Sequence, residues 1–181
     1  MFSQLARVSL DLLMLRRGPQ DMPSSWALMA GLAFTYCSLA FIQVSLVAEV
    51  APAITQAILA TIILVAYVNA VLRIRNFPDR FVQTLTAFFV VGCVLTVLML
   101  GPTSALAPFL HALAENPDAQ TAPQPPAIAL LAYMLIGFWS LIVFGHIYRH
   151  ALDVSLWMGI GAALLFEFTL FMTFALLGAG G

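Results

Sequence analysis

The chain has 181 residues, of which 62% are hydrophobic and only 8% are charged, and its formal net charge is −1. A soluble globular domain is close to half apolar and about one quarter charged, so this composition excludes a water-soluble globule. It also excludes a disordered chain, which needs low hydrophobicity and high net charge. The near-neutral charge offers no basic surface for nucleic acid. The composition therefore predicts a protein that crosses the lipid bilayer several times.

The first predicted element is a short amphipathic helix within residues 2–17. One of its faces is apolar at three- and four-residue spacing: Leu5, Val8, Leu12 and Leu15. Such a helix can lie in the membrane interface with its apolar side toward the acyl chains. We interpret residues 1–23 as a cytoplasmic amphipathic segment that orients the first span, with a helix that docks a partner as the alternative.

Five windows of the sequence are long and apolar enough to cross the hydrocarbon core, which takes roughly 20 residues of helix. They lie at about 24–48, 53–72, 81–100, 127–147 and 154–177. All ten prolines lie outside these windows, as expected of a residue that lacks the amide hydrogen and clashes with the preceding turn. The sequence therefore predicts an all-α, polytopic membrane domain over residues 24–178 with five transmembrane helices.

An outside loop is predicted at 101–126, and it is the only sizeable piece outside the bilayer. A short interfacial helix is expected in its first half (SALAPFLHALAE), and an extended linker in its second half (NPDAQTAPQPP). The loop contains no recognisable soluble domain. We therefore expect no catalysis by such a domain.

The arginines predict the orientation of the chain. With five spans, all seven basic residues fall on one side of the membrane: Arg7, Arg16, Arg17, Arg73, Arg75, Arg80 and Arg149. The other side carries the acidic residues Glu49, Glu115 and Asp118 and no Arg or Lys. The positive-inside rule then puts the N-terminus in the cytoplasm and the C-terminus outside. In this interpretation Arg73, Arg75, Arg80 and Arg149 are cytoplasmic orientation residues.

Two tryptophans agree with this orientation. Trp26 and Trp157 fall at the predicted cytoplasmic ends of the first and fifth spans, where an aromatic belt meets the headgroups. The composition uses arginine and no lysine and is rich in alanine, which is compatible with a bacterium. We expect a multi-pass protein of the bacterial inner (cytoplasmic) membrane.

Glu167 is the most informative single residue, because it lies near the middle of the fifth predicted span. An ionised carboxylate there costs several kcal/mol, so the group should face other helices or be protonated. No basic residue lies at its depth. It can be a proton or cation site, or a structural group that hydrogen-bonds Thr61, Thr35 or another subunit. A metal site with Cys37 and Cys93 can also be drawn, although buried cysteines more often act as small hydrophobes.

A second polar cluster follows the fourth span. His146, His150 and Asp153 occur at i, i+4 and i+7 and share one helical face. Two histidines and a carboxylate at this spacing can hold a metal ion. The zinc-protease motif also needs a glutamate directly after the first histidine, where this chain has Ile147. We expect no metal and no cofactor, and interpret the three residues as a polar cytoplasmic end that meets lipid headgroups.

Small residues at four-residue spacing predict close helix contacts in two spans. They are Ala27, Gly31 and Thr35 in the first span, and Gly159 and Ala163 in the fifth. Helices approach closely where side chains are small, because the backbones can then pack against each other. We therefore expect both stripes to lie at helix–helix contacts.

The stretch GHIYRHALDVSLWMGIGAALLFE, the five spans and the short cytoplasmic N-terminus resemble the Yip (Ypt-interacting protein) family, particularly its small bacterial members. The resemblance covers residues 24–178 in topology and the fourth-to-fifth hairpin in sequence. It implies a non-enzymatic multispanning protein. Eukaryotic members assist vesicle traffic and contact small GTPases through a longer N-terminal region, so that activity and its residues do not carry over.

Three functions follow from these features. We favour a non-catalytic membrane protein that binds the bilayer and a membrane-protein partner, or forms a homo-oligomer, as an assembly component. The alternative is a small transporter or channel subunit with Glu167 as an intramembrane proton or ion site. An intramembrane enzyme would need a metal at His146, His150 and Asp153. No Gly-rich phosphate loop, Ser/His nucleophile pair or paired-carboxylate motif is present in the sequence.

Overall fold

The computed structural model describes residues 2–115 and 124–178, and within these ranges every regular element is a helix. In chain order they are α1 (Phe2–Leu13), the 3₁₀ turn η1 (Pro19–Asp21), α2 (Trp26–Ser45), α3 (Val50–Ile74), the 3₁₀ turn η2 (Pro78–Arg80), α4 (Phe81–Glu115), α5 (Ala127–Leu152) and α6 (Leu156–Gly178). The five helices from α2 to α6 are long and apolar enough to cross a membrane. The predicted all-α fold with five transmembrane helices is confirmed.

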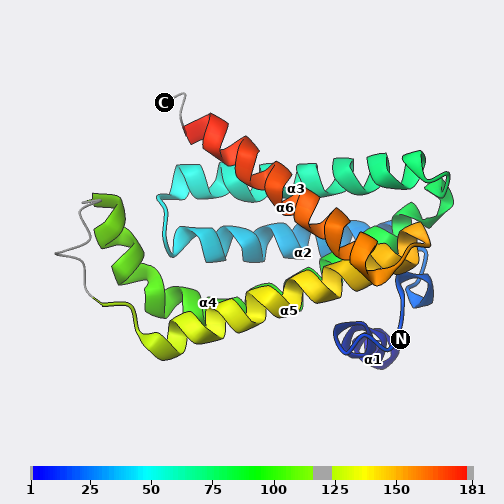
Figure 1. The fold of residues 1–181 in the computed structure, drawn as a ribbon, viewed down its shortest axis with the longest axis horizontal. Helices are drawn as coiled ribbons and strands as arrows, with labels where there is room; N and C mark the ends of the chain where they lie inside the picture. Colours follow the sequence, from blue (N-terminus) through cyan, green and yellow to red (C-terminus); the bar gives the residue numbers. More distant parts are fainter. Residues whose placement is uncertain (1, 116–123, 179–181) are drawn as a thin grey trace.

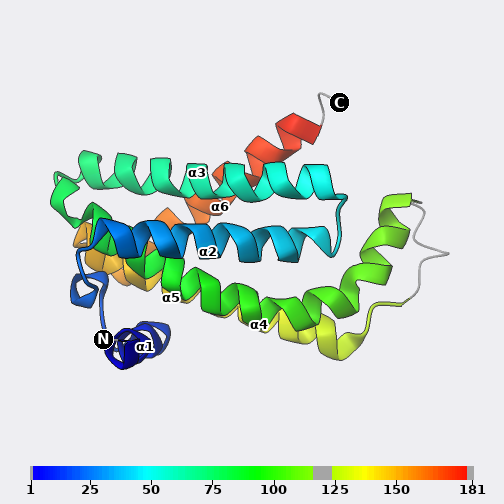
Figure 2. The same cartoon turned by 180° about the vertical axis from the view of Figure 1, so that it is seen from behind.

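The five long helices run alternately up and down, and α4 forms the centre of the bundle. Figures 1 and 2 show α2 beside α3, α5 running along α4, and α6 crossing α3 obliquely. The first half of α4 is almost wholly buried; its fully buried side chains include Leu85, Phe89 and Val91. This core explains why α4 packs against both α2 and α5.

The outer faces of the bundle are apolar. Phe34 on α2 is 76% exposed, and large apolar side chains are also exposed on α3, α5 and α6, including Ile62, Leu135 and Phe171. Soluble monomers rarely expose apolar patches on this scale. In lipid, by contrast, such a surface is solvated, while the helices satisfy their own backbone hydrogen bonds. The chain is a multi-pass membrane protein.

Close backbone packing joins α5 to α6. A Cβ atom added to Gly159 would meet the carbonyl oxygen of Gly145 and would lie 2.8 Å from the amide nitrogen of Arg149. Ala163, one turn further along α6, is also buried. The stripe predicted on α6 therefore lies at a helix contact. The stripe predicted on α2 is not at a helix contact: Ala27, Gly31 and Thr35 are all exposed, and a Cβ at Gly31 would find no atom within 4 Å.

Three helices end at the same end of the bundle in the same way. Leu15, Asn76 and Asp153 follow α1, α3 and α5 in the left-handed conformation, with φ of 59°, 62° and 54°. The next residue then donates its N–H five residues back, as Phe77 does to Leu72 O (2.8 Å). This is the Schellman arrangement, here made without glycine. We call this end, which holds Arg16, Arg17, Arg75, Arg80 and Arg149, the arginine end.

Helix α4 continues through two prolines that the sequence analysis placed in the outside loop. Pro102 and Pro108 lie inside the helix, which ends at Glu115, so the short helix expected in the first half of the loop is continuous with the third span. The position of the loop outside the membrane stays a prediction. Each proline removes one backbone hydrogen bond and favours a bend. The last turns of α4 bend upward beyond the end of α2 in Figure 2, and His111 Nε2 lies 3.1 Å from Leu46 O there. The predicted extended linker lies largely at 116–123, outside the described residues.

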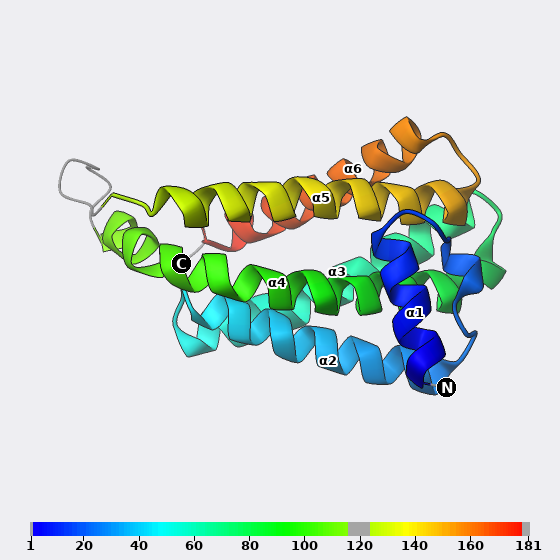
Figure 3. The same cartoon turned by 90° about the horizontal axis from the view of Figure 1, so that it is seen from below.

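The N-terminal helix is shorter than predicted and packs on the protein itself. It ends at Leu13, and the chain turns back at Leu15 so that Arg16 N–H donates to Asp11 O (2.8 Å). Figure 3 shows α1 lying across the end of α4, and it also contacts α5. Leu12 and Leu13 belong to the main core. The apolar side of α1 therefore covers helices of the bundle at the arginine end.

Candidate functional site

Two arginines fasten the hairpin between α3 and α4 to the end of α5. The Arg80 Nη1 atom donates to the carbonyl oxygens of His150 and Ala151, both at 3.1 Å. The Arg75 Nε atom donates to Leu152 O at 3.4 Å. These carbonyls lack helical partners and carry the negative end of the helix dipole, which a guanidinium stabilises. Both arginines therefore have a structural role in addition to the predicted one in orientation.

The other two orientation residues point away from this contact. Arg73 is exposed, and its Nε atom donates to Asn69 Oδ1 on the same helix (3.0 Å). Arg149 is exposed near the end of α5. Their charges lie at the arginine end, as their positions in the sequence require. The side of the membrane on which this end lies stays a prediction.

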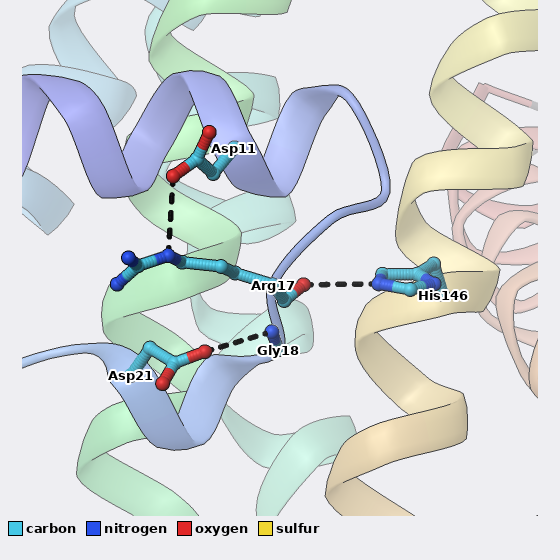
Figure 4. A network of polar contacts seen from close by, with 5 residues as sticks. All are labelled: Asp11, Arg17, Gly18, Asp21 and His146. Atoms are coloured by element: carbon cyan, nitrogen blue, oxygen red, sulfur yellow. Dashed lines mark hydrogen bonds and ion pairs between the residues drawn. The ribbon is translucent and has the colours of Figure 1, made fainter.

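His146 joins α5 to the N-terminal segment. Its Nε2 atom lies 2.9 Å from the carbonyl oxygen of Arg17, and since a carbonyl can only accept, Nε2 carries the hydrogen. The Arg17 side chain pairs with Asp11 (3.1 Å), and Asp21 accepts from the Gly18 N–H (3.2 Å). Figure 4 shows these contacts holding the turn after α1 against α5. The histidine is therefore a structural partner of the N-terminal segment.

The proposed metal ligands do not form a ligand set. The rings of His146 and His150 lie edge to face with centroids 4.5 Å apart. Asp153 closes α5 in the left-handed conformation. Within residues 2–115 and 124–178, no three His, Cys, Asp or Glu side chains come close enough to hold a metal ion. That holds equally for the combination of Cys37, Cys93 and Glu167.

A polar cavity of about 310 Å³ opens at the arginine end. Seven residues of η1, α4 and the end of α5 line it: Pro19, Gln20, Arg80, Gln83, Thr84, His150 and Asp153. Gln83 links α4 to the N-terminal segment beside the cavity, because its Nε2 atom donates to Gln20 O (3.4 Å) and Met22 O (3.2 Å). Thr84 is fully buried, and its hydroxyl has no hydrogen-bond partner among the described residues. The sequence pattern indicates His150 and Asp153 as candidate polar residues of this end, but it does not single out Gln83 or Thr84.

Glu167 has an exposed side chain, and its carboxyl group is near enough to Tyr36 of α2 and Tyr148 of α5 to interact with them electrostatically. It is the twelfth of the 23 residues of α6, so it sits at the middle of the helix, and its side chain is exposed. It forms no hydrogen bond or ion pair within the part of the chain that the structure describes. The predicted contacts with Thr61 and Thr35 are absent; these hydroxyls donate to Ala57 O (2.8 Å) and Gly31 O (2.9 Å) on their own helices.

A second cavity of about 330 Å³ lies toward the opposite end, between α2, α4 and α5. Its lining is mostly apolar and includes Val44, Leu106, Phe109 and Leu130. Glu167 lines neither of these two cavities. The exposed carboxyl group of α6 is therefore separate from both.

Comparisons with protein-family models, with curated proteins and with solved structures found no match for this chain. Two polar features of the fold indicate function: the cavity at the arginine end and Glu167 on α6.

Proposed function

We propose that this chain is a non-catalytic protein of the bacterial inner membrane, with its N-terminus in the cytoplasm, that assembles with a membrane partner through the outer face of α6. One observation carries the proposal: Glu167 is exposed at the middle of a transmembrane helix and has no hydrogen-bond partner within the described residues. The partner is another membrane protein or a second copy of this chain.

The energetics of a carboxyl group in hydrocarbon favour a partner. A charged side chain at the centre of a helix costs about 2.5–3.5 kcal/mol on insertion scales, and an unpaired neutral carboxyl also loses its hydrogen bonds to water. A second helix packed on this face would shield the group and supply a hydrogen-bonding atom, and such bonds contribute about 0.6–2 kcal/mol each. Glu167 therefore suits a polar contact between subunits.

Transport through this chain is the second function predicted from the sequence. A proton or ion site in a single chain needs the carboxyl group beside a path through the bundle. Glu167 lines neither of the two cavities described above, so these cavities provide no such path beside it. The resemblance to the Yip family stays a prediction, and it agrees with the proposal only in implying a non-enzymatic multispanning protein.

Two variants of Glu167 test the proposal. The wild-type chain, purified in mild detergent, should carry a stoichiometric partner or form an oligomer, measured as mass by native mass spectrometry. Glu167→Leu should lose this assembly, because it removes the polar group. Glu167→Gln should keep it, because the amide still hydrogen-bonds at a similar size.

The matched control is Glu49→Leu. Glu49 is exposed before α3 and makes no capping hydrogen bond with its side chain, so its removal should leave the assembly intact. A monomeric wild-type chain, or an assembly unchanged in Glu167→Leu, would contradict the proposal. Flux in liposomes that Glu167→Gln abolishes while assembly persists would support the transport alternative instead.

A further inference from the structure

The cavity at the arginine end combines both signs of charge. The guanidinium of Arg80 and the carboxylate of Asp153 line the same space, yet no ion pair joins them. The carbonyl end of α5 adds partial negative charge on the side of Asp153. A simple anion would be repelled by one part of this lining and a simple cation by the other. The cavity therefore suits a ligand that carries a negative and a positive group at separate positions.

The hydrogen-bonding groups of the cavity favour a phosphate as the negative group. Arg80 uses Nη1 for the carbonyls of α5, and no hydrogen bond of its other nitrogens occurs among the described residues. The hydroxyl of Thr84 is buried without a partner, which is costly unless a ligand pairs with it. A guanidinium and a hydroxyl are common donors to phosphate oxygens. Phe77 holds the guanidinium in place, with its ring centroid 4.1 Å from Arg80 Cζ.

The cavity lies at the level of the membrane interface. Trp26 begins α2 and Trp157 is the second residue of α6, and both are exposed at the arginine end. Exposed tryptophans at helix ends mark the depth of lipid headgroups. A volume of about 310 Å³ is at the lower limit for ligand pockets, roughly 300–1,000 Å³. It fits a headgroup and leaves the acyl chains outside.

We infer that this cavity binds the phosphoethanolamine headgroup of a membrane phospholipid. The phosphate accepts from Arg80 and Thr84, and the ammonium group pairs with Asp153. This inference does not depend on the assembly proposed for α6. The inference names a specific ligand for the exposed end of α5. The sequence predicted only that this end meets lipid headgroups.

The test measures which lipids stay bound to the purified full-length chain. Native mass spectrometry would compare phosphatidylethanolamine, phosphatidylglycerol and phosphatidylcholine with identical acyl chains. The wild-type chain should retain phosphatidylethanolamine about tenfold more than phosphatidylglycerol, the size expected for one charge-assisted contact. A parallel arm adds soluble phosphoethanolamine and follows the midpoint of thermal unfolding, which separates a lipid ligand from a free small molecule.

Two conservative variants keep the test independent of folding. Asp153→Asn removes the charge but keeps a residue that tolerates the left-handed conformation, so the preference over phosphatidylglycerol should disappear. Thr84→Val removes only the buried hydroxyl, so it should weaken lipid retention without lowering the unfolding midpoint of the lipid-free chain. Arg73→Gln is the control, because Arg73 lies at the same end but does not line the cavity.

The inference is supported if the preference exists and falls in Asp153→Asn, and if retention of all three lipids falls in Thr84→Val, with neither change in the control. Equal retention of the three lipids, a preference that survives in Asp153→Asn, or undiminished retention in Thr84→Val would overturn it. If soluble phosphoethanolamine raises the unfolding midpoint but phosphatidylethanolamine is not retained, the ligand is a free small molecule, and the inference of a lipid ligand is overturned.

Discussion

Gly159 and Gly145 set how closely α5 and α6 approach each other. The space beside Gly159 is filled by backbone atoms of α5, which cannot move aside as a flexible side chain would. Backbone contact of this kind is the usual way in which transmembrane helices pack. The sequence pattern could predict Gly159 as a contact, but it could not show that Gly31 is open, because spacing alone does not indicate which face meets a neighbour.

Gly159→Ala should destabilise the chain by about 1–3 kcal/mol, the usual cost of overpacking. The matched control is Gly161→Ala on the same helix, where a Cβ meets no atom within 4 Å. The measurement is the midpoint of denaturation in detergent by circular dichroism. Equal midpoints for the two variants would contradict the close contact between α5 and α6.

The polar residues differ in how well their surroundings could be predicted. Glu167 stands out in the sequence because an acid in an apolar run is rare at any depth. Which side chains surround it could not be predicted, since α6 is apolar on every side. Asp153 was predicted as a candidate metal ligand, whereas it closes α5 in the left-handed conformation. An aspartate directly after a helical run is a signal for such an end.

Among the elements, α1 shows that an amphipathic pattern alone does not decide whether the apolar face of a helix meets lipid or protein. An amphipathic helix can place its apolar face against lipid or against protein, and the period is the same in both. In the structure Leu12 is completely buried, whereas Leu10 is 58% exposed. The contact of Arg17 with His146 fixes the turn that follows. Such contacts join residues far apart in the sequence, so no local pattern predicts them.

Leu12→Ala should loosen α1 from the bundle, because truncating a fully buried leucine costs about 2–5 kcal/mol. The readout is trypsin cleavage at Arg16 and Arg17, which should become at least several-fold faster. Leu10→Ala removes the same atoms from the exposed side of α1 and should cleave at the wild-type rate. Identical rates for both variants would mean that α1 does not depend on this contact.

Helix α4 shows where local rules fail. Proline usually interrupts a helix, and this rule predicted an end before Pro102. The helix continues to Glu115, because a proline in a long apolar helix costs one hydrogen bond and a bend, which packing can offset. The spans themselves were predictable, since the length of an apolar run is a local property.

At the scale of the whole molecule, the two ends of the bundle differ in chemistry. The arginine end carries the network of Arg17, Arg75, Arg80 and His146 and a polar cavity, while the cavity near the other end is mostly apolar. This asymmetry agrees with the positive-inside rule, on which the cytoplasmic placement of the N-terminus still depends. The middle of the bundle carries one exposed acid, Glu167.

Photo-crosslinking in intact membranes tests most directly whether the outer face of α6 binds a partner. A photoreactive side chain would replace Phe171, one helical turn after Glu167, or Phe34 on α2 as the matched control; both phenylalanines are exposed. We predict an adduct from position 171 that disappears in the Glu167→Leu background, and none from position 34. No adduct from position 171, or equal adducts from both positions, would contradict the proposed assembly.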